Sequence, residues 1–244
     1  MSAFPGEGAA LVGVGVGPGQ ADLLTLRAVD ALRAADRVLA PTTSAESVGR
    51  AEAVVREVVP EAAIERVVFV MEVDSAARSA AIEHAATRTI EHLDAGERIA
   101  FVTIGDPNVY STFGSIAEEV RRRRPDVPVS TVPGIMAFQD LAARSGTVLV
   151  DGTEHLVLVP AHRGVDGPVA AAVAEPGAAV VVYKGGRRLG ELAEALDANG
   201  RLEGAVLGEL LGLPGERIAP LDEAADAPTT YLATVIAPPV RERP

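Results

Sequence analysis

The sequence predicts an α/β fold with two domains. Through the first half of the chain, short apolar runs that end in glycine or proline alternate with longer segments of helical periodicity. Near the C-terminus, apolar runs follow one another without helices between them. The length of 244 residues suits one large or two small domains. We therefore expect a mostly parallel sheet in an N-terminal domain, residues 1–132, and a mixed sheet in a C-terminal domain, residues 133–244.

The first half repeats a strand followed by a helix. Ala9–Val16 is an apolar run and is expected to be a buried strand. Asp22–Asp36 has apolar residues at helical spacing, and Asp22 is expected to cap this helix. The further elements expected here are strands at Val38–Ala40, stopped by Pro41, Val67–Met71, Arg98–Ile104 and Val127–Val132, and helices at Glu46–Val59, Ser75–Ala95 and Ser111–Arg124. Such repetition predicts a parallel sheet covered by helices on both faces.

In the second half of the chain, the expected strands and helices no longer alternate regularly. Its expected helices are Ile135–Ser145, Val169–Ala174 and Arg187–Ala198, and its expected strands are Leu156–Pro160, Ala178–Tyr183, Ala205–Leu210, Arg217–Pro220 and Tyr231–Ala237. Because the last three strands follow one another without helices between them, we expect antiparallel pairing among them.

Composition narrows the range of functions. Hydrophobic residues make up 48% of the chain, and there is no cysteine, which excludes disulfides and thiolate metal sites. The net charge of −12 disfavours binding to nucleic acid. The longest apolar stretch is interrupted at Glu175–Gly177, so no membrane span is expected, and the N-terminus lacks the pattern of a signal peptide. We expect a soluble, cytoplasmic protein.

A glycine-rich segment, Gly13–Gly19, lies between the first strand and the first helix. It fails the dinucleotide-binding fingerprint because Pro18 and Gln20 stand where glycine is required, and no lysine follows as in a phosphate loop. The glycines are compatible with a tight turn or with a loop that approaches a ligand closely.

Two further breaks follow strands at positions where α/β proteins bind ligands. Thr103–Thr112 contains Asp106 before Pro107, and its loop is expected at the same sheet edge as the glycine-rich segment. The alternative is an ordinary turn with Ser111 or Thr112 as helix cap. Lys184, the only lysine in the chain, follows a strand and precedes two glycines, which is compatible with a site or with an exposed strand end.

Taken in order, these motifs resemble the tetrapyrrole methylases of cobalamin and sirohaem synthesis. The order is G-V-G-P-G, G-D-P-x-x-Y-S-T, V-P-G-I, Y-K-G-G and L-P-G-E-R-I, from about Leu11 to Ile236. The stretch Gly105–Thr112 with Tyr183-Lys184 is most similar to the branch that methylates C20 of precorrin-2. The resemblance implies two α/β domains unlike the Rossmann methyltransferases, with S-adenosylmethionine (SAM) and a tetrapyrrole bound in the cleft between them. It also implies a homodimer.

The resemblance implies a set of site residues. SAM contacts would fall on Pro18, Ile104, Gly105, Asp106, Val109, Met136, Ala137, Lys184, Leu210 and Thr230. Met136 departs from the threonine that many relatives have after P-G-I. Catalytic candidates are Asp106, Lys184 and Tyr231, and substrate candidates are Arg27, Tyr110, Ser111, Thr112, His162, Arg163 and Arg187. Because the SAM sulfonium is already activated, no metal is expected.

The reaction that the resemblance implies moves a methyl group from SAM to C20 of precorrin-2, giving precorrin-3A. The alternatives are methylation of a cobalt-containing ring or of another corrin intermediate, and, more distantly, SAM or metabolite binding without catalysis. Other polar clusters are weaker. His84 and His92 are expected to be exposed on a long helix, too far apart for a metal site, and Arg121–Arg124 are expected to form a solvated helix end.

Overall fold

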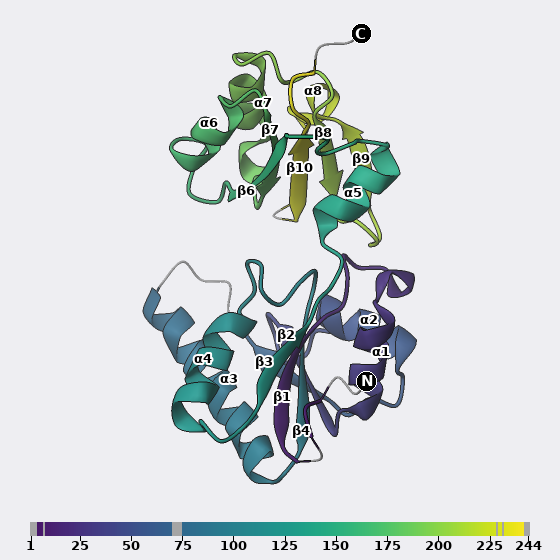
Figure 1. Ribbon diagram of the computed structural model, residues 1–244, viewed down its shortest axis with the longest axis vertical. Coiled ribbons are helices and arrows are strands. Elements are labelled where there is room, and N and C mark those ends of the chain that lie inside the picture. The colour runs from purple at the N-terminus through teal and green to yellow at the C-terminus, as the bar shows by residue number, and fades with distance from the viewer. Residues whose placement is uncertain (1–3, 7, 70–74, 228, 231, 242–244) are drawn as a thin grey trace. The chain divides into compact units, whose positions relative to one another are not determined.

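The computed structural model describes residues 4–6, 8–69, 75–227, 229–230 and 232–241. The chain divides into two compact units, Met1–Met136 and Ala137–Pro244 (Figure 1). Residues 133–136 therefore belong to the first unit, whereas the sequence predicts a domain boundary between residues 132 and 133. Each unit contains its own sheet and is described separately.

The first unit is built on a five-stranded sheet with the strand order β3-β2-β4-β1-β5. Its strands are β1 (Ala10–Gly15), β2 (Arg37–Thr42), β3 (Ile64–Val68), β4 (Arg98–Thr103) and β5 (Val129–Val132). Every neighbouring pair is parallel. All residues of β1 are buried, as expected for an inner strand covered on both faces. The predicted parallel sheet is confirmed.

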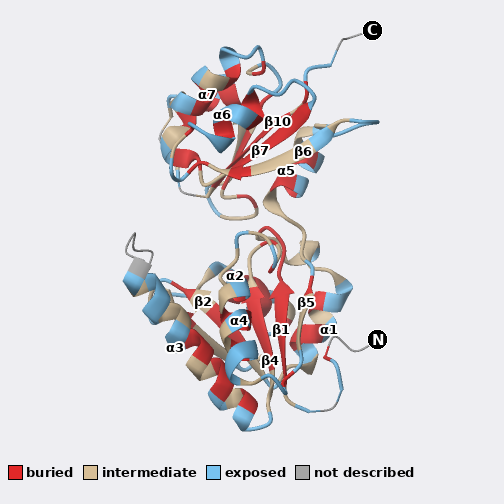
Figure 2. Cartoon of the chain, turned by 60° about the vertical axis from the view of Figure 1, so that its left-hand side comes forward, coloured by how far each residue is buried: buried red, intermediate tan, exposed pale blue. Residues whose placement is uncertain are grey.

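Helices cover both faces of this sheet (Figures 1 and 2). On one face, the short 3₁₀ turn η1 (Ala21–Leu23) precedes α1 (Leu26–Ala34), which shares a core with α2 (Arg50–Val58). The opposite face packs against α3 (Ser75–Asp94) and α4 (Phe113–Arg123). Since the strands are parallel, each helix that follows a strand starts near the carboxyl edge of the sheet.

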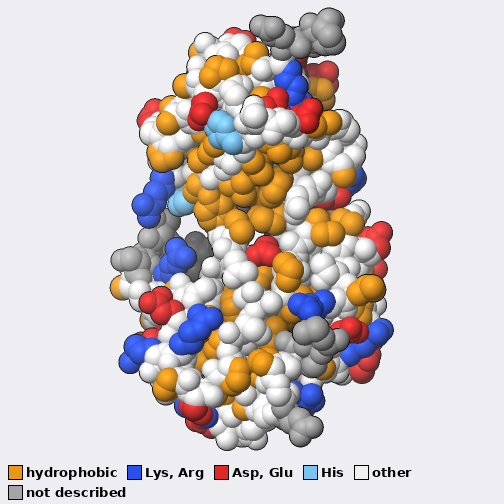
Figure 3. Space-filling view, in the orientation of Figure 1, with side chains coloured by type: hydrophobic (Ala, Val, Ile, Leu, Met, Phe, Trp, Pro, Cys, Tyr) orange, Lys and Arg blue, Asp and Glu red, His pale blue; other side chains and the backbone are white. Residues whose placement is uncertain are grey.

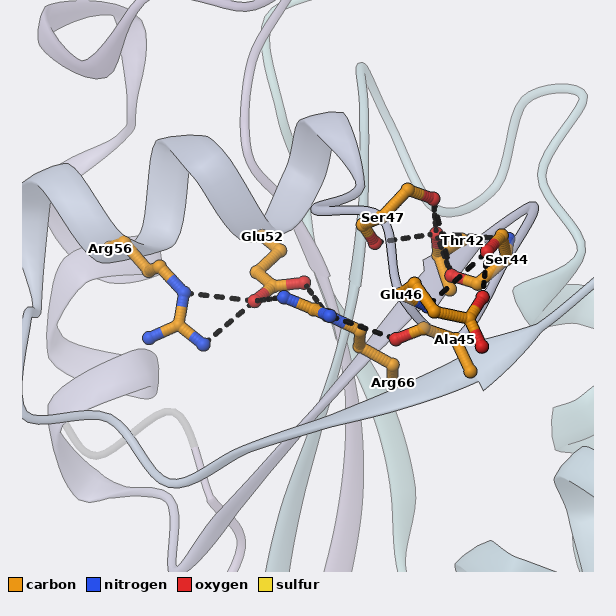
Figure 4. Close-up of polar contacts among 8 residues, drawn as sticks. All are labelled: Thr42, Ser44, Ala45, Glu46, Ser47, Glu52, Arg56 and Arg66. Carbon is orange, nitrogen blue, oxygen red and sulfur yellow. Dashed lines mark hydrogen bonds and ion pairs between the residues drawn. The ribbon is translucent and has the colours of Figure 1, made fainter.

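Three local expectations in this unit are wrong. Asp22 does not cap α1; the Thr25 hydroxyl accepts the Ala28 N–H at 3.1 Å instead. Strand β2 continues through Pro41, because β4 pairs only with Arg37–Leu39 and the proline lies beyond that ladder. Helix α2 starts at Arg50 rather than Glu46, because residues 42–47 form a turn around the Thr42 hydroxyl (Figure 4). Of the expected strand Val67–Met71, residues 70 and 71 lie outside the described residues.

The second unit contains a mixed sheet with the order β6-β7-β10-β8-β9. Its strands are β6 (His155–Pro160), β7 (Ala178–Tyr183), β8 (Val206–Glu209), β9 (Arg217–Pro220) and β10 (Ala233–Ala237). Only β6 and β7 run parallel; the other neighbouring pairs are antiparallel, as predicted for the last strands.

The helices of this unit are shared between the two faces of the sheet. Helix α5 (Ala137–Ser145) packs against β10 and β8. The opposite face holds the core formed with α6 (Pro168–Val173), η2 (Gly186–Arg188), α7 (Leu189–Asp197) and α8 (Leu221–Ala224). Helix α8 was not predicted, because four residues are too few for a helical period to be recognised.

Arg201 is a buried cation in this unit. Its guanidinium donates hydrogen bonds to carbonyl oxygens of Ala172, Val173, Glu175, Ala178, Ala237 and Pro238. The bonds join the end of α6, the start of β7 and the end of β10. Burial lowers the pKa of Arg201, since the charged form loses water.

Among the described residues, no helix combines the length and apolar character needed to cross a membrane.

Candidate active site

Three loops of the first unit meet at the carboxyl edge of its sheet. They follow the neighbouring strands β4, β1 and β5. The Gly105 N–H donates to the Gly17 carbonyl at 2.8 Å. A Cβ atom on Gly134 would lie 2.1 Å from the Gly105 carbonyl oxygen, and one on Gly15 would lie 2.5 Å from the same atom. The expectation that the loops share one edge is confirmed, and packing between loops already explains why glycine stands at Gly15 and Gly134.

Asp106 links two of these loops. Its Oδ1 accepts the Asn108 N–H at 2.8 Å, and its Oδ2 accepts the Gly134 N–H at 3.1 Å. The carboxylate therefore holds the G-D-P loop against the P-G-I turn. This geometry gives Asp106 a positioning role, since both of its carboxylate oxygens accept backbone hydrogen bonds.

Several other predicted site residues of this unit lie on the loops at the same edge. Pro18 is on the loop after β1, Ile104 and Val109 are on the loop after β4, and Met136 follows the P-G-I turn. Ser111, rather than Thr112, accepts the N–H of Phe113, the first residue of α4, at 3.1 Å.

Tyr110 and Arg27 complete the candidates of this unit. Tyr110 has a left-handed backbone, φ 51°, and is partly exposed; burial of its ring raises the pKa of the phenol. Arg27 is exposed in the first turn of α1.

The second unit gathers its predicted residues at one edge of its own sheet. Strands β6 and β7 end there together, and the Ala161 N–H donates to the Tyr183 carbonyl at 2.8 Å. This places the segments containing His162, Arg163, Lys184 and Arg187 side by side. Leu210 immediately follows β8 at the same edge and donates its N–H to the Leu232 carbonyl at 3.3 Å.

The start of α5 belongs to the same group of segments. The Phe138 N–H donates to the Tyr183 hydroxyl at 3.4 Å, so Ala137 lies near the end of β7. Arg187 also lines a pocket of about 450 Å³ together with Leu189, Asp226 and Thr229. Tyr231 lies outside the described residues.

Two residues of this unit have a left-handed backbone, one just after β7 and one just after β8. Lys184 has φ 59° and Leu210 has φ 51°, and both immediately follow a strand. Residues with side chains rarely adopt this region, and each such residue costs on the order of 1–3 kcal/mol. The fold keeps lysine and leucine at positions where glycine would be strain-free, which is typical of functional positions.

Sequence reasoning missed Glu209 and Arg217. The Glu209 side chain is buried; one carboxylate oxygen accepts the Thr230 N–H, and the other lies 3.1 Å from Arg217 Nη2. Arg217 also donates to the Thr229 hydroxyl at 3.2 Å. Thr230 is therefore contacted on two sides, because its N–H donates to Glu209 and its carbonyl oxygen packs on Gly186. The L-P-G-E-R-I motif contains Arg217, but nothing in the sequence indicated its partner.

A second ion pair anchors the loop between β8 and β9 to α5. Arg144 Nη1 lies 2.6 Å from a Glu216 carboxylate oxygen, and the same carboxylate accepts the Gly212 N–H at 2.6 Å. The Arg144 guanidinium, helped by the Gly212 N–H, lowers the pKa of Glu216 to about 2.

Two weaker clusters lie away from these edges. His92 was expected to be exposed, but only 14% of its side chain is; its Nε2 lies 2.8 Å from Glu65 and its Nδ1 3.0 Å from Glu97. The side chains of Arg122 and Arg124 form ion pairs at the end of α4 and just beyond it. Within the described ranges, no group of three or more potential metal ligands occurs.

The fold and the motif-bearing loops define a methyltransferase class. Residues 10–225 match the family described as Tetrapyrrole (Corrin/Porphyrin) Methylases, and the chain belongs to this family. The expected two-domain α/β methyltransferase is therefore confirmed at the level of family and fold.

Comparison with individual proteins is more specific. A precorrin-2 C(20)-methyltransferase from Sinorhizobium sp is 32% identical over 96% of this chain and 97% of its own length. The cobalt-precorrin-2 C(20)-methyltransferase of Salmonella typhimurium is 27% identical over 93% and 94% of the two chains. The uroporphyrin-III C-methyl transferase from Thermus thermophilus, solved in complex with S-adenyl homocysteine, has a TM-score of 0.65, 26% identity and coverage of 94% and 97%.

Proposed function

We propose that this protein transfers a methyl group from SAM to C20 of precorrin-2, giving precorrin-3A. The observation that carries the proposal is the similarity to the Sinorhizobium precorrin-2 C(20)-methyltransferase, which extends over 97% of that enzyme. The motif loops at the carboxyl edge of the first sheet support it, since this is where α/β folds bind ligands. The proposed site residues lie at the motif-bearing edge of each unit's own sheet.

The residues present are suited to SAM. The proposed contacts in the first unit are backbone and apolar groups of Pro18, Ile104, Gly105, Val109 and Met136, held in place by Asp106. In the second unit, Ala137, Lys184, Leu210 and Thr230 lie at one sheet edge, two of them with left-handed backbone. When bound, SAM supplies a methyl group already activated by its sulfonium, so we propose that no metal is required.

Catalysis by this chain is then chiefly a matter of positioning. The nucleophile is an electron-rich ring carbon, and aligning it with the methyl group lowers the barrier through proximity. The Asp106 side chain keeps two loops in register, so its proposed catalytic contribution is to orient the site or to face the developing positive charge of the ring. Lys184 is placed to pair with a substrate carboxylate. Tyr231 remains our candidate for proton transfer from C20.

Recognition of the substrate requires local positive charge. Precorrin-2 carries carboxylates, whereas the protein has a net charge of −12, so long-range attraction has the wrong sign. His162, Arg163, Lys184 and Arg187 follow β6 and β7 at one edge, which supports a carboxylate-binding role for them. In the first unit, Tyr110, Ser111 and Thr112 are proposed to face the ring.

A cobalt-containing ring is the second candidate substrate, favoured by the similarity to the Salmonella enzyme. Incubation of the protein with SAM and either precorrin-2 or cobalt-precorrin-2, followed by mass spectrometry and NMR of the product, tests both. One added methyl group at C20 supports the proposal. Methylation at another carbon would indicate a different corrin methylase, and SAM binding without product would indicate a non-catalytic protein.

We also propose a cytoplasmic homodimer. Apolar side chains gather over β6 in the second unit (Figure 3), and α5 packs against β10 and β8. An apolar face of this kind suits contact with a second copy. Light scattering at micromolar concentration should give the mass of two chains, and a monomer would contradict the assignment.

A further inference from the structure

The loop between β8 and β9 begins with a residue whose backbone conformation must be held by its surroundings. Leu210 has φ 51° although it carries a side chain, and Gly212 has φ 72°. A left-handed residue other than glycine persists only where other contacts fix it. The Leu213 N–H donates to the Leu210 carbonyl at 2.9 Å, and the Glu216 N–H donates to the Leu213 carbonyl at 3.0 Å. Both bonds lie within the loop, so contacts outside it must set where Leu210 lies.

The Glu216 side chain connects this loop to α5. One of its carboxylate oxygens accepts the Gly212 N–H at 2.6 Å, and both oxygens accept hydrogen bonds from the Arg144 guanidinium. Arg144 lies in the last turn of α5, where its Nη1 is also 3.5 Å from the buried carboxylate of Asp140. A guanidinium that makes two parallel bonds fixes the orientation of its partner as well as its distance. The ion pair therefore holds the loop in a defined place against the helix.

Helix α5 is itself firmly seated on β8. A Cβ atom on Gly208 would lie 2.8 Å from the Leu141 side chain, so this glycine allows the helix to approach the strand closely. The helix begins at Ala137 and carries Arg144 in its last turn. Seven residues of helix are about two turns. The helix is thus a short, rigid connection between a proposed SAM contact at its start and the ion pair near its end.

On the other side of Leu210, Glu209 connects the loop to the segment before β10. Its buried carboxylate accepts the Thr230 N–H. Leu210 therefore lies between two anchored carboxylates, one bound to the segment of Thr230 and the other to the helix that starts at Ala137. These three residues are proposed SAM contacts. Fixing them in one arrangement before the ligand arrives lowers the entropic cost of binding it.

We propose that Glu216 and Arg144 are positioning residues for SAM, whose ion pair holds Leu210 and the start of α5 in the arrangement that binds the cofactor. The proposal rests on the SAM contacts of the proposed function and adds two residues that act through others and not on the reacting atoms. Loss of the ion pair releases the loop, so that other loop conformations compete with the one that binds SAM. The apparent affinity then falls in proportion to the population of the binding conformation.

Calorimetry with S-adenosylhomocysteine measures this effect without a tetrapyrrole. Glu216→Gln and Arg144→Gln should each raise the Kd about 3–10-fold, as expected if the binding conformation falls to about a tenth to a third of the population. Arg144→Lys keeps the positive charge but cannot donate two parallel hydrogen bonds, so its Kd should lie between those of wild type and Arg144→Gln. The double variant should lose no more affinity than the weaker-binding single variant, because both changes remove the same pair.

The second unit contains a matched ion pair for the control. Glu154 accepts the Asp151 N–H at 2.7 Å and lies 2.7 Å from Arg241; 20% of its side chain is exposed, against 25% for Glu216. It immediately precedes β6, at the end of that strand opposite the site residues. Glu154→Gln should lower the urea midpoint about as much as Glu216→Gln does, yet leave the Kd for S-adenosylhomocysteine within about two-fold of wild type.

The outcomes separate this proposal from the proposed function. Wild-type affinity in Glu216→Gln, or an equal loss of affinity in Glu154→Gln, refutes the positioning role, while methylation of precorrin-2 by the wild-type protein would still support the proposed function. A wild-type protein that binds no S-adenosylhomocysteine contradicts the proposed SAM site itself, and both proposals then fail.

Discussion

Gly134 offers a quantitative test of how the three loops meet. In Gly134→Ala, the new Cβ would lie 2.1 Å from the Gly105 carbonyl oxygen and 2.8 Å from the Gly15 Cα. Both neighbours are backbone atoms of short loops, so relief requires a shift of about 1 Å in a close-packed region. Such overpacking costs about 3 kcal/mol, and loss of the Gly134 hydrogen bond to Asp106 adds about 1 kcal/mol.

The expected loss of unfolding free energy is therefore about 4 kcal/mol in the first unit. Urea denaturation followed by circular dichroism measures it, and hydrogen exchange of peptides from β1, β4 and β5 assigns it to that unit. Gly114→Ala is the control: this glycine lies in α4 with nothing within 4 Å of a new Cβ, so alanine should be neutral or stabilise by up to about 1 kcal/mol. A Gly134→Ala protein within about 0.5 kcal/mol of wild type would refute the proposed packing of the loops.

Three further predictions concern the second unit. The pKa of Glu216 is lowered from 4.5 to about 2, so its pair with Arg144 should stabilise the fold fully above about pH 5, and this stabilisation should be lost as the pH falls toward 2. After solvent screening the effect is about 1–2 kcal/mol in acid denaturation, and Arg144→Gln should remove most of it, leaving the part due to the Gly212 N–H. Glu209→Gln keeps an acceptor for Thr230 but loses the charge facing Arg217, and calorimetry should show about 3–10-fold weaker SAM binding with little change in Tm. Arg201→Met should cost about 2–4 kcal/mol in urea denaturation by leaving carbonyls unpaired, and an unchanged midpoint would contradict that.

The arrangement of strands was predictable from the sequence because apolar runs and helical periods are long, repeated signals. The placement of Asp106 and Lys184 after strands followed from the same signals. Which of two similar residues takes a given role, such as capping a helix, was not predictable from the sequence. Asp22 and Thr25 are both good helix caps, and only the path of the chain through η1 selects Thr25.

The sequence also did not reveal which polar residues pair with partners far away along the chain. The pairing of Glu209 with Thr230 depends on β8 and β10 being neighbours, and a carboxylate at a strand end looks the same in sequence whether or not it is buried. His92 likewise looked like an exposed helix residue until β3 and the start of β4 brought two carboxylates to it.

The left-handed residues Tyr110, Lys184 and Leu210 have a consequence for laboratory selection. At each position glycine would relieve backbone strain, so a library screened only for thermal stability should become enriched in glycine there. A library screened for methyl transfer should retain the native side chains at the positions that serve the reaction. The difference between the two enriched libraries would therefore separate side chains kept for chemistry from those kept by chance, without any prior assignment of roles.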